Sequence, residues 1–219
     1  MDADSRFQKW QEWLNIIYSD IQQLLINRHI FNEVQEIISS NPQIQIGSAF
    51  YNWMGTIYPA AMVMGVRRQL DNRNDCISLV RLLKEIKKNP KVLTRKRYLS
   101  MYNDSSLPDF VPNTEFDSYC DGGKEYIDLV KVNEDLINLK FKAEKIKSFA
   151  TKRIAHFDKE IFEDFPSYGE LDAVLDYLEE IFKKYSLVLR ADTSDLLPIF
   201  LYDWKKIFRY PWIVSNKRI

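Results

Sequence analysis

Apolar side chains recur at steps of three and four residues along most of this chain, and this spacing constrains the fold more than any other feature. It is the spacing of an α-helix that buries one face. Such series occur along nearly the whole chain, whereas stretches that alternate like a strand are at most four residues long. We therefore predict an all-α, antiparallel helical bundle with extra helices at its ends. The longest series is Leu129, Val132, Leu136, Leu139, Ala143, Ile146 and Ala150.

Two series end in charged residues where a further apolar side chain would be expected. The longest series continues to Arg153 and then to Phe157. Both series are expected to face the core, where a charged side chain needs a partner. We therefore predict that Asp71 forms an ion pair or a hydrogen bond with Arg67 or Arg153. Arg67 and Asp71 continue the second series, which begins with Ile46, Phe50, Trp53, Ile57, Ala60 and Met64.

Proline, glycine and cap residues divide the chain into separate helices. Asp75 is the expected N-cap of the fourth helix, which should pair antiparallel with the third. Ser167 and Glu170 match a capping box at the start of a later helix. Residues 91–113 are expected to be irregular, with a long loop at Pro108 and Pro112. In chain order, the predicted helices or their apolar stripes cover residues 7–24, 31–38, 46–71, 77–86, 95–102, 124–157, 171–185 and 195–208.

Composition favours one folded domain over residues 1–219, since 46% of the residues are hydrophobic and 14% are aromatic. Lys and Arg number 31, as do Asp and Glu, so any binding of nucleic acid has to be local. The 2 cysteines and 2 histidines lack the spacing of a metal site, so we expect no metal and no cofactor. The acidic start is unlike a secretory signal, and we expect a cytoplasmic protein.

The stretch from residue 37 to residue 66 carries no charge and is long enough to cross a bilayer. Pro59 and several Asn and Gln residues interrupt it, and Trp53 and Tyr58 lie in its middle rather than at its ends. A helix buried in a bundle also requires such a composition. We therefore expect no membrane span.

Basic residues gather in two segments despite the balanced total. Residues 84–97 hold seven basic residues against Glu85, and residues 140–153 hold six against Glu144. One interpretation is that these are solvated helix faces whose charges meet acidic residues across the bundle. The other is a local basic groove that binds an RNA backbone.

Arg153 and His156 are three residues apart, so on an α-helix they would lie on one face. The histidine could transfer a proton near neutral pH while the guanidinium holds a phosphate. Metal-free RNA cleavage, in which a 2′-hydroxyl attacks the adjacent phosphate, needs these two roles. Alternatively, Arg153 forms a structural ion pair with Asp71 or Asp158, and His156 is hydrogen-bonded beside it.

The segment Ala150–His156, with the sequence ATKRIAH, resembles the late-helix signature of the HEPN superfamily, particularly its abortive-infection AbiU-like branch. Three further segments agree with that branch: Gly65–Asp71, Ser78–Leu83, and the closing Asp203-Trp204 with Arg209–Trp212. The resemblance implies an all-α bundle that dimerises and, in many members, a metal-free endoribonuclease. It also implies a role in phage defence or in a toxin–antitoxin pair, in some members with a nucleotidyltransferase-type partner.

The resemblance places the candidate site at His156 and Arg153, with Arg67, Arg68, Asp71 and Lys152 in supporting or RNA-binding positions. The family arginine precedes its histidine by more residues, and those positions here hold Thr151, Ala150 and Phe149. We therefore expect weak or absent RNA cleavage. Two functions stay open: an RNA-binding or RNA-cleaving protein, and a non-catalytic dimeric module in which the cluster is structural. Aromatic residues that suit a homodimer interface are Trp10, Trp13, Tyr210 and Trp212.

Overall fold

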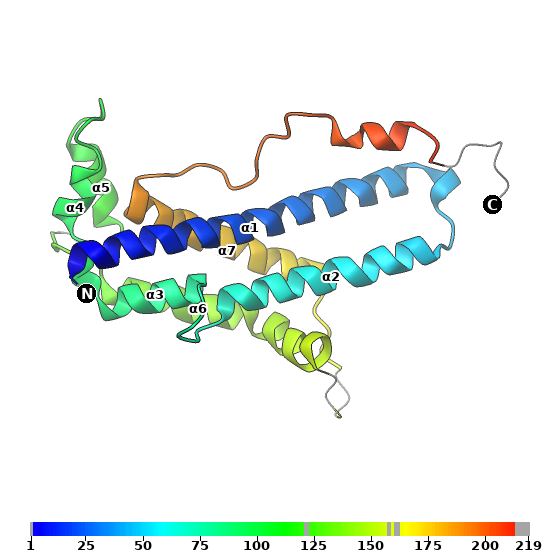
Figure 1. Ribbon diagram of the computed structural model, residues 1–219, viewed down its shortest axis with the longest axis horizontal. Coiled ribbons are helices and arrows are strands. Elements are labelled where there is room, and N and C mark those ends of the chain that lie inside the picture. Colours follow the sequence, from blue (N-terminus) through cyan, green and yellow to red (C-terminus); the bar gives the residue numbers. More distant parts are fainter. Residues whose placement is uncertain (1, 121–122, 157–158, 160–162, 213–219) are drawn as a thin grey trace.

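The computed structural model describes residues 2–120, 123–156, 159 and 163–212, and it forms a bundle of long helices (Figure 1). Its main helices are α1 (Ala3–Ser40), α2 (Ala49–Leu70), α3 (Leu79–Lys88), α6 (Leu129–Phe149) and α7 (Tyr168–Arg190). In the described part of the chain there is no strand, only an isolated β-bridge between Thr94 and Tyr126. The predicted all-α bundle is confirmed.

The core forms where the apolar stripes of α1, α2, α6 and α7 meet. The predicted stripe of α6 is buried from Val132 to Ala150, and only its first member, Leu129, is exposed. Gly65 lets α2 approach α1 closely, because a Cβ at this position would lie 2.3 Å from Leu24 Cδ2. Burial of these apolar side chains is the main force that holds the bundle together. Other core residues include Leu14, Ile17, Ile21, Met62, Val66, Leu175, Leu178 and Ile181.

The capping box at the start of α7 is confirmed. Ser167 Oγ accepts a hydrogen bond from the Glu170 backbone N–H at 3.2 Å, and Glu170 Oε2 accepts one from the Ser167 backbone N–H at 2.7 Å. These bonds satisfy two backbone donors that the first turn of a helix leaves free.

Two boundary predictions near the N-terminus are wrong. Residues 7–24 and 31–38 belong to one continuous helix, α1, because no proline or glycine interrupts the segment between them. The N-cap of α3 is Ser78, whose Oγ accepts from the Arg81 backbone N–H, and Asp75 does not cap it.

The predicted antiparallel pairing of α2 with α3 is also wrong. Arg68 on α2 contacts Asp20 near the middle of α1, whereas Glu85 on α3 contacts Arg6 near its start. Both helices therefore run antiparallel to α1, and α3 continues in the direction of α2 (Figure 1). The eight residues between these helices, 71–78, do not reverse the chain.

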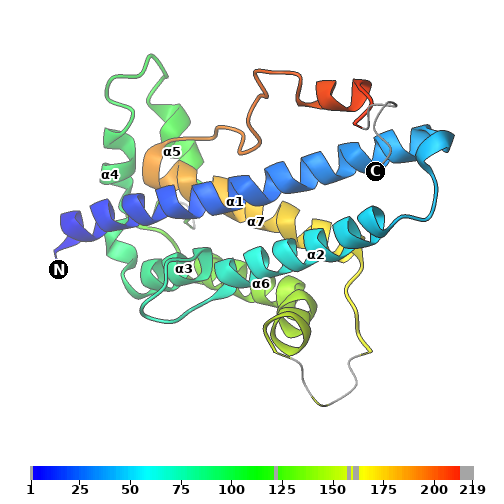
Figure 2. The same ribbon diagram turned by 45° about the vertical axis from the view of Figure 1, so that its right-hand side comes forward.

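The prediction that the series from Ile46 through Ile57 faces the core is wrong. Phe50, Trp53 and Ile57 expose 48%, 57% and 50% of their surface, and the buried face of α2 is formed by residues of its second half. Figures 1 and 2 show the reason, because the first half of α2 runs beside α1 beyond the end of α6. No helix covers its outer face in the described part of the chain.

A smaller unit at one end of the bundle contains α4 (Arg95–Ser100) and α5 (Phe110–Asp117). Its own core consists of Tyr98, Phe116 and Cys120. The short helix expected near residues 95–102 is confirmed, but α5 occupies part of the expected loop. Pro112 lies in the first turn of α5, where a missing N–H costs little.

After α7, residues 191–212 run along α1 as a strap (Figure 1). The helix expected over residues 195–208 does not form, and only η4 (Trp204–Arg209) has helical, 3-10 geometry. Among the aromatic residues predicted for an interface, Trp10 is fully buried and Trp13 packs against the core. Tyr210 and Trp212 are exposed.

Short 3-10 turns η1 (Pro42–Ile44) and η2 (Pro90–Val92) follow α1 and α3. None of the helices within the described ranges combines the length and apolar character that a bilayer crossing needs.

Candidate nucleic-acid interface

The segment that carries Arg153 and His156 is not a regular α-helix. Residues Ala150–Ala155 form a π-helix, η3, in which the hydrogen bonds close a wider turn. His156 lies beyond the end of this turn, with extended dihedrals of φ −141° and ψ 149°, and its side chain is exposed. The expectation that Arg153 and His156 share one α-helical face is therefore wrong. The predicted neighbours Phe157 and Asp158 lie outside the described residues.

Asp71 does not pair with Arg67 or Arg153 as predicted. It caps the end of α2 with extended dihedrals, so its carboxylate meets the turn that follows. Asp71 Oδ2 lies 3.0 Å from Arg73 Nε, and Oδ1 accepts the Arg73 backbone N–H at 3.0 Å. Burial raises the pKa of Asp71, but the hydrogen bonds from Arg73 and Cys76 and the Arg73 charge together lower it below its ordinary value.

Arg68, another predicted site residue, holds α2 against α1. Its guanidinium lies 2.6 Å from Asp20 Oδ1, and Gln69 Nε2 donates to Asp20 Oδ2 at 2.6 Å. Gln69 Oε1 also accepts the Leu79 backbone N–H at 3.0 Å, which fixes the start of α3. Arg68 thus has a structural role in this arrangement. The predicted cluster of Arg67, Asp71, Arg153 and His156 does not form as one unit.

A groove of about 570 Å³ does lie between the end of α2 and the second half of α6. On the α2 side it is lined by Arg67, Asp71 and Arg73. On the α6 side its lining residues are four, three and four positions apart, as expected for one helical face. These residues are Lys140, Glu144, Lys147 and Thr151.

The charges in this groove are unevenly paired. Asp71 forms an ion pair with Arg73, and Glu144 Oε2 lies 4.0 Å from Lys147 Nζ. Among the described residues, Arg67 and Lys140 have no hydrogen bond and no ion pair. Two cations that line the groove therefore have no ion-pair partner in the described structure, which favours binding of an anion.

The positive charge extends onto α3 through Lys84. Burial lowers the pKa of Lys84, and the neighbouring charges of Lys140, Lys88 and Arg81 lower it further. Repulsion between neighbouring cations lowers the pKa of a lysine in this way. An anion placed between them would relieve this repulsion.

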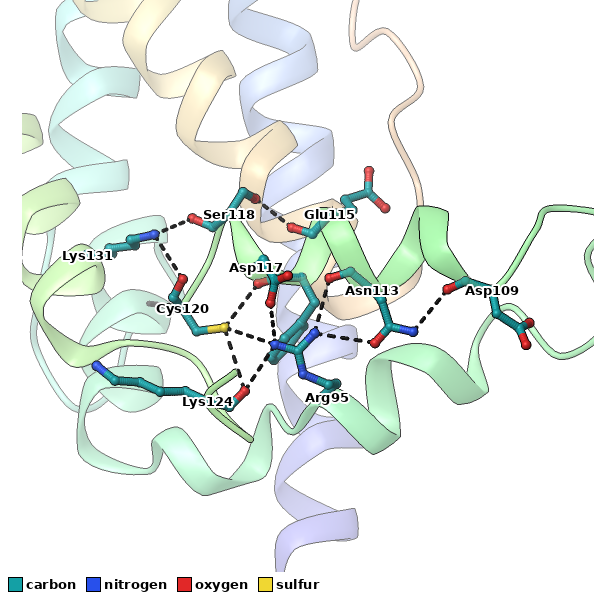
Figure 3. Close-up of polar contacts among 10 residues, drawn as sticks. Arg95, Asp109, Asn113, Glu115, Asp117, Ser118, Cys120, Lys124 and Lys131 are labelled. Carbon is teal, nitrogen blue, oxygen red and sulfur yellow. Dashed lines mark hydrogen bonds and ion pairs between the residues drawn. The ribbon is translucent and has the colours of Figure 1, made fainter. Parts of the chain in front are cut away.

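The two arginines of the first predicted basic segment have partners within the fold. Figure 3 shows the Arg95 guanidinium between α5 and the chain near Lys124. It contacts Asp117 Oδ1 at 2.5 Å, the Asn113 carbonyl at 3.1 Å and the Lys124 carbonyl at 3.2 Å. Arg97 pairs with Asp4 and lies 4.6 Å from the centre of the Phe7 ring. These arginines are partly buried and tie the small unit together and to α1.

Of the predicted site residues, only Arg67 and Asp71 line the groove. Lys152, Arg153 and His156 follow Thr151 but are not among its lining residues. Sequence reasoning did not single out Arg73, Lys140 or Lys147 as site residues. The regular spacing of Lys140, Lys147 and Thr151 could have indicated a shared face. No group of three or more His, Cys, Asp or Glu side chains suited to a metal occurs within the described ranges.

A family model described as AbiU2, of the HEPN type, matches residues 7–207. No curated protein and no solved structure gives a match. The matched region contains α1 from residue 7 onward, α2 to α7, the groove and the π-helical turn. The chain therefore belongs to the AbiU2 family of HEPN proteins.

Proposed function

We propose that this protein binds single-stranded RNA through the groove between α2 and α6 and cleaves it weakly or not at all. Membership of the AbiU2 family points to an abortive-infection type of defence. The observation that supports the RNA proposal best is that Arg67 and Lys140, two cations without a partner in the described structure, line opposite walls of one groove. Phosphate neutralisation by such residues supplies most of the affinity for a nucleic-acid backbone.

Two observations argue against efficient cleavage. A general acid or base has to be held within hydrogen-bond reach of the reacting group. His156 is exposed beyond the end of η3, outside the groove lining. The three positions that correspond to the family arginine hold Thr151, Ala150 and Phe149, none of which carries a guanidinium.

Binding and cleavage can be tested separately. Fluorescence anisotropy with a labelled 20-nucleotide single strand should show binding that Arg67→Gln and Lys140→Gln each weaken. Lys96→Gln is a matched control, because Lys96 is an exposed cation of α4 outside the groove lining. Equal binding by all four proteins would contradict the proposal.

Incubation of the same RNA with the purified protein in EDTA tests cleavage. We expect intact RNA after hours, and the same result for His156→Ala. Robust cleavage that His156→Ala abolishes would show that this histidine is catalytic. The exposed position of His156 predicts that the variant folds normally.

The second candidate function is a non-catalytic dimeric module. It is favoured by the structural partners of Asp71 and Arg68, and by the exposed apolar row on α2. A homodimer would use Phe50, Trp53 and Ile57 rather than the buried Trp10. Light scattering at micromolar concentration tests it, and a monomeric mass would count against it. A nucleotidyltransferase-type partner and a cytoplasmic location also stay predictions.

A further inference from the structure

A second hollow of about 450 Å³ lies between the second half of α1, the first half of α2 and the start of α7. Four aromatic residues line it, and the rings of three of them, Phe31, Tyr58 and Tyr168, have nearly parallel planes. Phe31 and Tyr58 stack with ring centres 3.7 Å apart and an angle of 2° between their planes. Tyr168 lies 5.7 Å from Phe31 and 6.2 Å from Tyr58, at 20° to each. Tyr168 exposes 49% of its surface, so its ring is open to a ligand.

A half-buried carboxylate lies beside these rings. Asp172 lines the hollow, and its side chain has no hydrogen bond and no ion pair within the part of the chain that the structure describes. The nearby Arg28 is directed to Asp176 Oδ1 at 2.5 Å and reaches only the backbone carbonyl of Asp172. Both carboxylate oxygens of Asp172 are therefore available to donors from a ligand.

Electrostatics agree with this arrangement. Burial raises the pKa of Asp172; the Arg28 charge lowers it and the Asp176 charge raises it. Burial and then the Asp172 charge raise the pKa of Tyr58 to about 12, so its hydroxyl stays protonated. The hollow thus holds a carboxylate, Asp172, that accepts no hydrogen bond from the described part of the chain.

We propose that this hollow is a nucleobase-binding site that prefers guanine. Parallel rings offer a flat face on which another flat ring stacks, whereas a cage for a quaternary ammonium needs rings at steep angles around it. A carboxylate accepts two adjacent N–H donors best, and the guanine edge has such a pair in its N1–H and its 2-amino group. Adenine and cytosine have a ring nitrogen acceptor next to the amino group, which the carboxylate repels.

The position of the hollow fits a strand that also occupies the basic groove. A smaller hollow of about 180 Å³, lined by Pro59, Val63, Phe149 and Tyr168 among others, lies between the two along α2. Tyr58 and Arg67 are about 14 Å apart along the helix axis and about two and a half turns apart, so a strand that reaches both has to pass partly around α2 by way of the smaller hollow. A few nucleotides of single strand could place a base on Tyr168 and a phosphate at Arg67. The inference that the natural ligand is a base within an RNA strand rests on the proposed RNA-binding function.

The base site is tested first with uncharged nucleosides, which do not need the groove. Saturation-transfer NMR should detect guanosine on the protein, inosine more weakly because it lacks the 2-amino group, and adenosine least. Tyr168→Leu should remove the guanosine signal, and Asp172→Asn should remove the preference for guanosine over inosine. Tyr202→Leu is the matched control, since Tyr202 is an exposed tyrosine on the strap.

The second arm uses a nine-nucleotide RNA of A and C with one central G. Tyr168→Leu should weaken its binding about tenfold, in the range found for loss of one base-stacking side chain. Replacement of the G by inosine should weaken binding to the wild type but not to Asp172→Asn. Thermal melting of each variant checks folding, and the exposure of Tyr168 predicts little change.

The outcomes separate the two proposals. Guanosine binding without RNA binding would support the base site and contradict the proposed function. RNA binding that depends on Arg67 and Lys140 but not on Tyr168, with no guanosine signal, would overturn the base site alone. Choline binding in place of guanosine would also overturn it, because the hollow would then be a cation site.

Discussion

The two basic segments of this chain have similar charge, but individual cations within them have different roles. In residues 84–97, Arg95 and Arg97 point inward and join acidic or carbonyl partners on other elements. In residues 140–153, Lys140 faces a groove opposite Arg67, and neither has a partner in the described structure. The comparison teaches that the charge of a segment does not identify a binding surface. The position of the unpaired cations does: in the described structure Lys88, Lys91 and Lys96 of the first segment also have no hydrogen bond and no ion pair, but they do not line the groove.

The largest expected effect on stability concerns Arg95. Arg95→Met removes hydrogen bonds that join α4 to α5 and to the chain near Lys124, and should cost about 2 kcal/mol. For a chain of this size that corresponds to a fall of about 4 to 8 °C in Tm. Calorimetry checks the change, with Lys96→Met as control. RNA affinity should stay the same, and a large loss of affinity with normal stability would break the comparison.

For the groove cations we expect the converse: a loss of RNA affinity without a loss of stability. The double variant Arg67→Gln/Lys140→Gln should bind RNA about tenfold or more weakly at 100 mM salt, because two phosphate contacts are lost. Its Tm should be unchanged or slightly higher, since Lys84 loses a repulsive neighbour. Anisotropy and calorimetry on the same preparation measure both. A folding defect without loss of binding would assign these cations to the scaffold.

A smaller effect is expected for Arg68→Gln. Arg68 is more than half exposed, and Gln69 still donates to Asp20, so the loss should be below about 1 kcal/mol. RNA binding should not change, because Arg68 contacts α1 rather than the groove. A loss of RNA affinity comparable to that of Arg67→Gln would show that Arg68 belongs to the RNA-binding site.

The smallest effect is a change in the titration of Lys84. Its folded-state pKa lies below the ordinary value of 10.5, so the folded chain releases this proton first as pH rises. Stability should therefore increase with pH between the lowered pKa and 10.5. Lys140→Gln should raise the pKa of Lys84 only in part, because burial is the larger cause. NMR titration of the lysine side chain measures this shift. An unchanged pKa would show that the charge of Lys140 does not act on Lys84.

Much of the fold could be predicted from the sequence, since local signals and long-range packing agree there. The stripe of α6 and the capping box at Ser167 were predicted correctly because each depends on residues close in the chain. The exposed row on α2 could not be predicted, because α2 has apolar residues on two faces. Which face is covered depends on where α6 ends.

The candidate site was predicted only in part. Residues 150–155 contain no proline or glycine, so nothing in the sequence indicates a π-helical turn that moves His156 off the helix. The prediction paired Asp71 with Arg67 or Arg153, but its carboxylate forms an ion pair with Arg73, which lies two residues away in the chain. Arg67 was predicted as a supporting residue of a site at His156, and in the structure it lines the groove opposite Lys140, a pairing that depends on tertiary packing.

The salt dependence of RNA binding tests the central claim most directly. A plot of log affinity against log salt concentration should have a slope that falls by about 0.7 for each phosphate contact removed from a single strand. We expect Arg67→Gln and Lys140→Gln each to reduce the slope by about this amount and Arg97→Gln to leave it unchanged. Equal slopes for the groove variants and the wild type, or a reduced slope for Arg97→Gln, would contradict the account.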